Sequence, residues 1–197
     1  MRVRMREEII SELRTTEPAA FVSSHIFDRT PHVFGDDKSR HMVWRGQLAS
    51  SLGVDPVEVT IVGSAAVGVS LSPHKNFKIF DQDSDIDVAI VSPFHFQTAW
   101  RFFRRNSSLR AKLSGVERNA WDEHRTRLIY WGTIATDKLL SRLPFGLEWR
   151  SALDKLESVI ENDHAINIRI YNDYDSLRQY QIQSVRLRRD DLLSEKG

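Results

Sequence analysis

Residues 57–92 read VEVTIVGSAAVGVSLSPHKNFKIFDQDSDIDVAIVS and join two strand-like segments through a glycine turn. Residues 57–61 alternate apolar and polar side chains, which is the pattern of a half-buried strand, and they lead almost directly into Gly63. A polar, lysine-bearing stretch over 72–84 has the composition of a loop. Residues 85–91 then predict a second strand. The segment therefore predicts a strand–turn–loop–strand unit at the centre of the fold.

The second strand begins with two aspartates, although aspartate is among the poorest strand-forming residues. Side chains two apart point to the same face of a strand, so Asp85 and Asp87 project together. Two adjacent carboxylates repel each other unless they share a cation or a proton. Because oxygen ligands suit hard divalent ions, the pair predicts a Mg²⁺ or Mn²⁺ site. The alternative interpretation is an acidic turn ahead of a strand.

The glycine turn is the candidate phosphate-binding element. Gly63 allows the backbone to approach a ligand closely, and Ser64 adds a hydroxyl and an amide. Residues 65–69 can begin a helix whose free amides point toward an anion. Asp85 follows Gly63 by 22 residues on the next predicted strand. A phosphate held by the turn would therefore lie beside a metal ion held by the aspartates.

The arrangement G-S-x-x-x-G, followed by D-I-D-V after a strand of type VEVTIV, resembles a known family. It is the nucleotidyltransferase fold shared by DNA polymerase beta, poly(A) polymerases, aminoglycoside nucleotidyltransferases and bacterial dinucleotide synthases. The likeness covers residues 57–92, and other segments are similar to uncharacterised bacterial members of the superfamily. By position, it implies that Gly63 and Ser64 hold a nucleoside triphosphate, ATP among the candidates. It also implies that Asp85 and Asp87 ligate the catalytic metal ions, Mg²⁺ or Mn²⁺, and that two such ions about 4 Å apart stabilise the entering and the leaving oxygen.

The resemblance implies a magnesium-dependent nucleotidyltransferase reaction. An acceptor hydroxyl would attack the α-phosphate of the triphosphate in line, pyrophosphate would leave, and a nucleoside monophosphate would be transferred. Enzymes of this family act mainly by positioning the reacting groups and by stabilising their charge, and they do not form covalent bonds to them. RNA, a protein hydroxyl and a small molecule all remain open as the acceptor.

Family members usually add a third carboxylate from a later, neighbouring strand. The expected late strand here is AINIRIYND, residues 165–173, and no carboxylate lies in the middle of its polar face. Three positions stay open: Asp173 at the strand end, Glu58 before the glycine turn, or Arg169 in place of the acid. Without a third acid, the alternative function is a catalytically impaired binding subunit of a bacterial toxin–antitoxin or anti-phage defence complex.

The predicted fold class is α+β: a small nucleotidyltransferase-type sheet of three to five strands flanked by helices, with extra N- and C-terminal helices. We expect a single domain over residues 1–197 with its core motif region at 57–92. Helical additions are expected at 1–55 and 93–161. A late strand and a C-terminal helix are expected within 164–197.

Composition narrows the protein class. The chain has 197 residues, 41% of them hydrophobic and 28% charged, which is typical of globular domains. Cysteine is absent, which excludes disulfide scaffolds, thiol nucleophiles and cysteine–zinc sites. The sequence has no recognisable export signal and no apolar stretch of membrane-spanning length. We therefore expect a cytoplasmic protein without a membrane partner.

Basic residues are unevenly distributed. Arginine outnumbers lysine 21 to 7, and residues 101–127 hold eight basic residues against three acids. Arginine presents a planar fork that suits phosphate and carboxylate groups. That stretch is either a solvated helix face or a surface that faces a nucleotide or nucleic acid. Lys75 and Lys78 similarly belong either to a flap over the triphosphate or to a solvated loop.

Overall fold

The computed structural model describes residues 2–156 and 164–194. In these residues the strands form a four-stranded mixed sheet in the order β1-β2-β4-β3. They are β1 (Val59–Val62), β2 (Ile86–Val91), β3 (Thr133–Ala135) and β4 (Ile166–Tyr171). β2 runs parallel to β4, whereas β1 is antiparallel to β2 and β3 is antiparallel to β4. The predicted α+β fold, a small sheet flanked by helices, is confirmed.

Helices make up most of the remaining chain. The α-helices are α1 (Arg2–Thr15), α2 (Pro18–Val22), α3 (Lys38–Leu52), α4 (Gly63–Val67), α5 (Pro93–Arg105), α6 (Gly115–Glu123), α7 (Gly146–Leu156) and α8 (Tyr174–Ser194). Two short π-helical turns are η1 (Ser23–Phe27) and η6 (His124–Leu128). The 3₁₀ turns are η2 (His32–Phe34), η3 (Pro56–Glu58), η4 (Pro73–Lys75), η5 (Ser107–Lys112) and η7 (Leu140–Arg142). Residue 1, residues 157–163 and residues 195–197 of the predicted segments lie outside the described residues.

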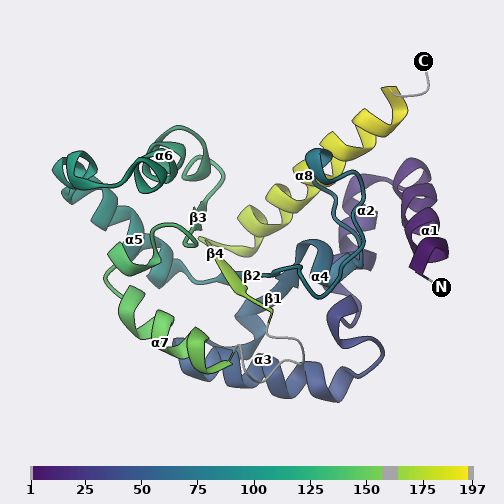
Figure 1. The fold of residues 1–197 in the computed structure, drawn as a ribbon, viewed down its shortest axis with the longest axis horizontal. Coiled ribbons are helices and arrows are strands. Elements are labelled where there is room, and N and C mark those ends of the chain that lie inside the picture. Colours follow the sequence, from purple (N-terminus) through teal and green to yellow (C-terminus); the bar gives the residue numbers. More distant parts are fainter. Residues whose placement is uncertain (1, 157–163, 195–197) are drawn as a thin grey trace.

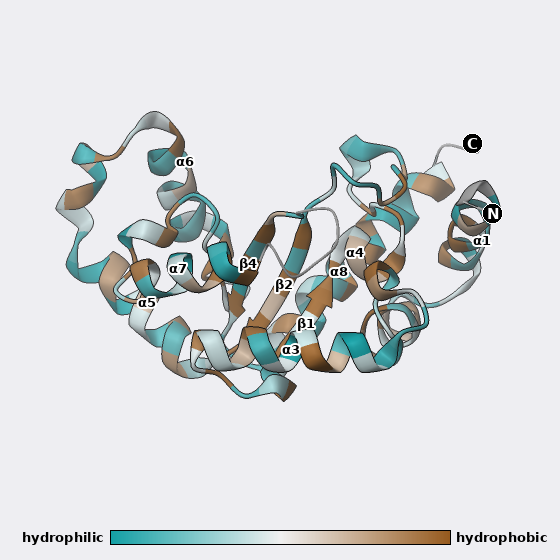
Figure 2. Ribbon diagram, turned by 60° about the horizontal axis from the view of Figure 1, so that its bottom comes forward, coloured by the Kyte–Doolittle hydropathy of each residue, from teal (hydrophilic) through white to brown (hydrophobic). Residues whose placement is uncertain are grey.

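The sheet lies between two groups of helices. Figure 1 shows α5, α6 and α7 on one side of the sheet and α1, α2 and α8 on the other. α3 runs along a third side and packs against α7. Figure 2 gives the same arrangement from a turned view and shows brown, apolar segments on β1, β2 and β4. Both chain ends lie on the side of α1 and α8 (Figure 1).

The two faces of the sheet differ in character. Ile86, Val88 and Ile90 of β2 are fully buried and point to one face, because they alternate along the strand. They pair in register with the three isoleucines of β4, so this face is apolar. The opposite face carries Asp87, which pairs with Asn167. One face therefore anchors the sheet in the core, while the other carries polar side chains.

Helix α8 covers only one end of the polar face. Tyr171, at the end of β4, is fully buried, and its ring lies 5.9 Å from the ring of Tyr180 in α8. Asp87, near the start of β2, is exposed. The polar face is thus closed at the Tyr171 end and open at the Asp87 end.

The core is continuous across the described residues. Buried apolar side chains from Ile9 in α1 to Leu192 in α8 belong to one contact cluster that includes all four strands. Burying a large aliphatic side chain contributes about 1.5–3 kcal/mol, so this cluster supplies the main stabilising contribution. None of the described helices is both long and apolar enough to cross a membrane.

Two details of the strands differ from the sequence-based expectation. Val57 is not part of β1: it lies in η3 and is 63% exposed. The cause is local, since Asp55 and Glu58 form a capping box that closes the 3₁₀ turn. β3 lies within the segment 93–161, which was expected to be helical, so that expectation is wrong for these residues. Its three residues are too few to show a strand period.

Candidate functional site

At the open end of the polar face, the backbone of Gly63 passes close to Asp87. Val62, the last residue of β1, pairs with Asp87 in β2, so the turn that follows β1 passes over this aspartate. A Cβ atom placed on Gly63 would lie 2.8 Å from Oδ2 of Asp87. The φ angle of Gly63 is +66°, which side chains rarely tolerate. The backbone conformation thus favours glycine here, and any side chain would displace the Asp87 carboxylate.

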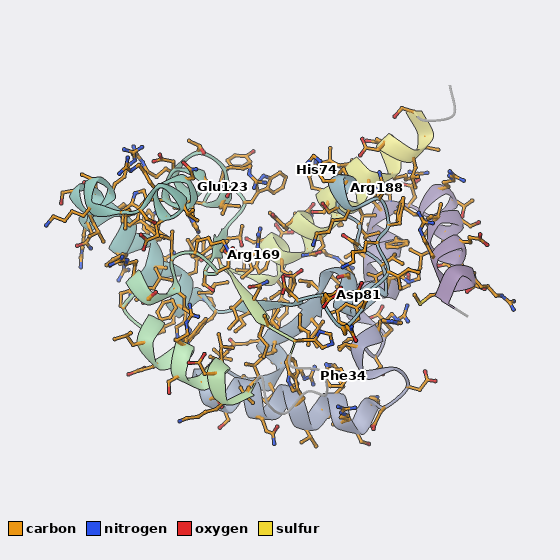
Figure 3. The ribbon with its side chains drawn as sticks, viewed as in Figure 1. Phe34, His74, Asp81, Glu123, Arg169 and Arg188 are labelled. Carbon is orange, nitrogen blue, oxygen red and sulfur yellow. The ribbon has the colours of Figure 1, made fainter. Side chains whose placement is uncertain are left out.

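A pocket of about 650 Å³ opens above this contact. Its size is typical of small-molecule sites. Asp87, Asn167 and Arg169 of the sheet line the pocket together with the Gly63–Ser64 turn. Figure 3 shows Arg169 near the middle of the molecule, between the helix that carries Glu123 and the segment that carries His74. The remaining lining comes mostly from the 70–75 segment, from α8 and from the region around β3, including His74, Lys75, Arg127, Asp137, Tyr180, Gln181 and Ser184.

The carboxylate of Asp87 carries the clearest electrostatic signal of the site. Although the side chain is open to the pocket, surrounding protein desolvates it, and this burial raises the pKa of Asp87 above its usual range. The positive charge of Arg169 acts in the opposite direction. The negative charge of Asp85 raises the pKa further, whereas Lys75 and a hydrogen bond from Asn167 lower it. Asp85 and Asp87 therefore lie close enough to repel each other.

Asp85 stands just outside the strand. β2 begins at Ile86, and Asp85 is exposed immediately before it. No ion pair to Asp85 or Asp87 forms within 4.0 Å in the described part of the chain. Two neighbouring carboxylates without an ion-pair partner fit one hard divalent cation whose remaining ligands are water or phosphate oxygens.

The described part of the chain brings no third acidic ligand to this pair. Among the described residues, no group of three or more His, Cys, Asp or Glu side chains is placed to hold a metal ion. Asp137 lines the pocket but lies beyond β3, where its Oδ2 is 4.0 Å from Nζ of Lys138. The described residues therefore fit a site with two carboxylate ligands.

Two of the three positions left open for a third acid lie elsewhere. Glu58 accepts a hydrogen bond from the Asp55 amide at 3.1 Å, four residues before Val62. Four residues of extended chain span about 13 Å, so Glu58 is at the far end of β1 from Asp87. Asp173 caps α8 by accepting from the Ser176 amide at 2.7 Å.

The hydrogen bonds from Ser176 and Asn172 hold the pKa of Asp173 below its usual range. Asp173 follows β4 by two residues, beyond the end of the strand at which Tyr171 pairs with Val91. It thus lies at the covered end of the polar face. Arg169 alone of the three positions is brought next to Asp87.

Arg169 stands on the floor of the pocket in a fixed orientation. Its register partners on both sides are small, Ala89 in β2 and Ala135 in β3, which leaves room for its side chain. Its guanidinium lies over the Tyr180 ring, 4.8 Å from the centroid, and Nη1 donates to the Tyr180 hydroxyl. Side chains that stack and hydrogen-bond in this way lose little further freedom on binding an anion.

The segment between the motifs is a folded flap, defined here as residues 68–80. The Ser70 amide donates to the Lys78 carbonyl at 2.8 Å, and the Phe80 amide donates to the Gly68 carbonyl at 2.9 Å. At the flap tip, Phe77 is buried with a positive φ of 54°, and the guanidinium of Arg188 lies 4.0 Å from its ring centroid. The flap is therefore attached to α8.

The two lysines of the flap have different positions. Lys75 lines the pocket, and its charge lowers the pKa of Asp87. Lys78 lies outside the pocket lining and pairs with Asp81 at 3.1 Å. The structure thus brings together Gly63, Ser64, Lys75, Asp87 and Arg169, with Asp85 beside them, and leaves Lys78 apart.

Several pocket residues were not singled out as site residues in the sequence. Tyr180, Gln181 and Ser184 share one side of α8, but no local pattern separates them from packing residues. In the sequence, Arg127 was marked by its position in the basic stretch 101–127. Asp137 lies in a three-residue turn after β3, and no sequence pattern marked it as a site residue.

Comparisons with known proteins returned nothing. The sequence matches no protein-family model and no curated protein, and the fold matches no solved structure.

Proposed function

We propose that this chain is a magnesium-dependent nucleotidyltransferase that transfers a nucleoside monophosphate from a nucleoside triphosphate to a hydroxyl acceptor and releases pyrophosphate. The observation that carries the proposal is the contact of the Gly63 turn with Asp87 at the floor of a pocket. A backbone turn that favours glycine, placed against a carboxylate, suits a phosphate held beside a metal-binding group. The motif resemblance over residues 57–92 supports the same chemistry.

The motif residues and Lys75 have the following roles in this proposal. Asp85 and Asp87 would hold one Mg²⁺ or Mn²⁺, which when bound neutralises charge on the reacting phosphates. Gly63 and Ser64 would receive the phosphate chain, and Lys75 would contact its oxygens from the flap. These groups bind and orient the triphosphate, so that an acceptor hydroxyl meets the α-phosphate opposite the departing pyrophosphate.

The positive lining supports a polyanionic ligand. Lys75, Arg127 and Arg169 contribute three cationic side chains to the pocket, and His74 adds a titratable one. Guanidinium and ammonium groups form charge-assisted hydrogen bonds with phosphate oxygens. ATP is the first triphosphate to test. RNA, a protein and a small molecule are the candidate acceptors. We also propose a cytoplasmic location, because a sequence without cysteine fits a reducing compartment.

Pyrophosphate release tests the proposal. The purified chain is incubated with each of the four nucleoside triphosphates, first in Mg²⁺ and then in Mn²⁺, with and without total RNA as acceptor. We expect release with at least one triphosphate, and its loss in the Asp85→Ala/Asp87→Ala double variant. Asp83→Asn is the matched control, because Asp83 is exposed on the same segment and lies outside the pocket. Release that survives in the double variant contradicts the assignment.

One observation favours a second candidate, a nucleotide-binding subunit that turns over poorly. β4 presents Asn167 and Arg169 next to Asp87, where the resembled family supplies a carboxylate. Such a subunit would act within a larger assembly, such as a bacterial toxin–antitoxin or anti-phage defence complex. It predicts magnesium-dependent binding of ATP, measured by calorimetry, without pyrophosphate release. Binding without turnover under all conditions above would favour this candidate over the enzyme.

A further inference from the structure

We propose that the pocket works with a single divalent cation, and that Arg169 binds the phosphate chain from the β4 position where a further metal-binding carboxylate is otherwise expected. This inference rests on the proposed function, since it concerns the same nucleotide. In this arrangement Arg169 neutralises phosphate charge on the β4 side of the pocket. The cation held by Asp85 and Asp87 would neutralise charge on the β2 side.

The sheet register places Arg169 beside the carboxylate pair. Asp87 pairs with Asn167, and Ala89, the next residue of β2 on the same face, pairs with Arg169. The Cα atoms of Asp87 and Arg169 are therefore separated by one strand spacing and two residues, about 8 Å. An arginine side chain extends across that distance, and its charge lowers the pKa of Asp87.

The described residues supply no carboxylate that pairs directly with Arg169. In the residues that the structure describes, no Asp or Glu oxygen lies within 4.0 Å of its guanidinium. Its contacts are the ring and the hydroxyl of Tyr180, which leave the other guanidinium donors directed elsewhere. Asp87 lies near enough to feel the charge of Arg169 but forms no ion pair with it, so this partly buried guanidinium is suited to an anion supplied by a ligand.

A second guanidinium approaches the same place. Arg127 lines the pocket, and its hydrogen bond to Glu123 raises the pKa of Arg127, to which the Tyr180 hydroxyl adds a smaller contribution. Arg127 and Arg169 thus converge on one hydroxyl from η6 and β4. Glu123 already pairs with Arg127, whereas Arg169 forms no ion pair within 4.0 Å in the described residues, so a phosphate at this point would pair with Arg169 and would also be attracted by Arg127.

The same cations oppose a second metal ion. A dication on the β4 side of Asp87 would lie against the guanidinium of Arg169, and like charges disfavour that arrangement. Within residues 2–156 and 164–194 no third carboxylate offsets the repulsion, because Asp137, on the far side of β4, is not grouped with Asp85 and Asp87. Arginine is charged at every physiological pH, so it supplies its positive charge without a metal equilibrium.

Counting bound metal ions tests the inference. The chain is mixed with an equal concentration of α,β-methylene ATP, which cannot release pyrophosphate, and titrated with Mn²⁺ while free Mn²⁺ is followed by electron paramagnetic resonance. We expect one tightly bound Mn²⁺ per chain. Two bound ions per chain would overturn the inference and direct attention to Asp137 as a ligand.

Variants of Arg169 provide a second readout. Arg169→Gln should weaken the binding of α,β-methylene ATP about tenfold or more, because a hydrogen-bonded charge to phosphate is lost. It should leave the Mn²⁺ count at one, and Arg169→Lys should recover part of the affinity. Arg125→Gln is the matched control, since Arg125 is exposed two residues from Arg127 and outside the pocket lining. Equal affinity of Arg169→Gln and the wild type would overturn the inference.

The outcomes separate this inference from the proposed function. If the analogue binds with two Mn²⁺, or binds independently of Arg169, the inference fails while nucleotide transfer stands. If the chain binds no analogue in any metal, both fail. If it binds the analogue with one Mn²⁺ and loses affinity on Arg169→Gln but releases no pyrophosphate from ATP, the inference holds for the binding subunit.

Discussion

Replacing Gly63 with alanine is the sharpest perturbation that the site offers. The new Cβ would lie 2.8 Å from Oδ2 of Asp87, closer than such atoms pack in folded proteins. The φ angle of +66° adds strain, because an L-residue in this region costs about 1–2 kcal/mol. Moving the Asp87 carboxylate away from its preferred rotamer costs a further 0.5–1.5 kcal/mol or so. We therefore expect a loss of about 1.5–3.5 kcal/mol in the free energy of unfolding.

Gly53 provides a matched control for the backbone contribution. Its φ angle is +68°, nearly that of Gly63, but no atom lies within 4 Å of its Cβ position. Gly53→Ala should therefore lose only the backbone part, about 1–2 kcal/mol. The difference between the two variants isolates the contact with Asp87. In an Asp87→Ala background this difference should disappear, because the carboxylate is gone.

Urea unfolding at neutral pH measures both losses, and Mn²⁺ titration with α,β-methylene ATP measures the site. Gly63→Ala should weaken metal–nucleotide binding strongly, and a misplacement of about 1 Å at reacting groups can lower turnover about 100-fold. Gly53→Ala should leave binding unchanged. The reasoning is refuted if both variants lose the same stability and Gly63→Ala still binds the metal–nucleotide complex like the wild type.

Three further predictions concern charge and packing. Burial raises the pKa of Asp87, so ionisation of this carboxyl opposes folding once the pH exceeds the ordinary aspartate pKa. Asp87→Asn should therefore raise the metal-free melting temperature near neutral pH. The gain should shrink as the pH is lowered toward about 4. A melting temperature that falls at neutral pH would contradict this. Burial lowers the pKa of His124, whose Nδ1 and Nε2 bond to the Ala120 carbonyl and the Ala135 amide, so its neutral form stabilises the fold and this stability is lost as pH falls through about 6.5. The advantage of the wild type over His124→Gln should therefore narrow between about pH 7.5 and 5.5, and a constant difference in melting temperature would count against it. Trp121 is 1% exposed, so Trp121→Ala should lower the free energy of unfolding by about 3–5 kcal/mol, measured in urea. A loss below about 1 kcal/mol would show that the surrounding side chains repack.

The elements with a local period were predictable from sequence. Alternating isoleucines indicated β4, and its bounds of 166–171 match the expected late strand. A helical period indicated α8, and a glycine in the left-handed conformation at Gly53 ends α3 where expected. Asp85 and Asp87 stood out because aspartate is rare in strands. These signals depend on neighbours in the chain, so a single sequence contains them.

The arrangement around Asp87 was not predictable in the same way. Arg169 is separated from Asp87 by 82 positions, and only the parallel pairing of β2 with β4 brings the two together. Strand pairing over that distance depends on packing of the whole core, which leaves no local pattern. Glu58 was a candidate third acid because it belongs to the alternating pattern of residues 57–61. In the structure it forms a capping box with Asp55 and lies outside the strand. Asp137 reaches the pocket through a turn after a strand of three residues.

The lengths of the outer strands limit how another chain can associate with this one. β1 and β3 form the two edges of the sheet and contain only four and three residues. Long, flat edges invite the addition of a foreign strand and the formation of aggregates, whereas short edges resist it. The Ala135 amide at the β3 edge is already bonded to His124. A protein partner should therefore recognise side chains on the helices or around the pocket, and not extend the sheet.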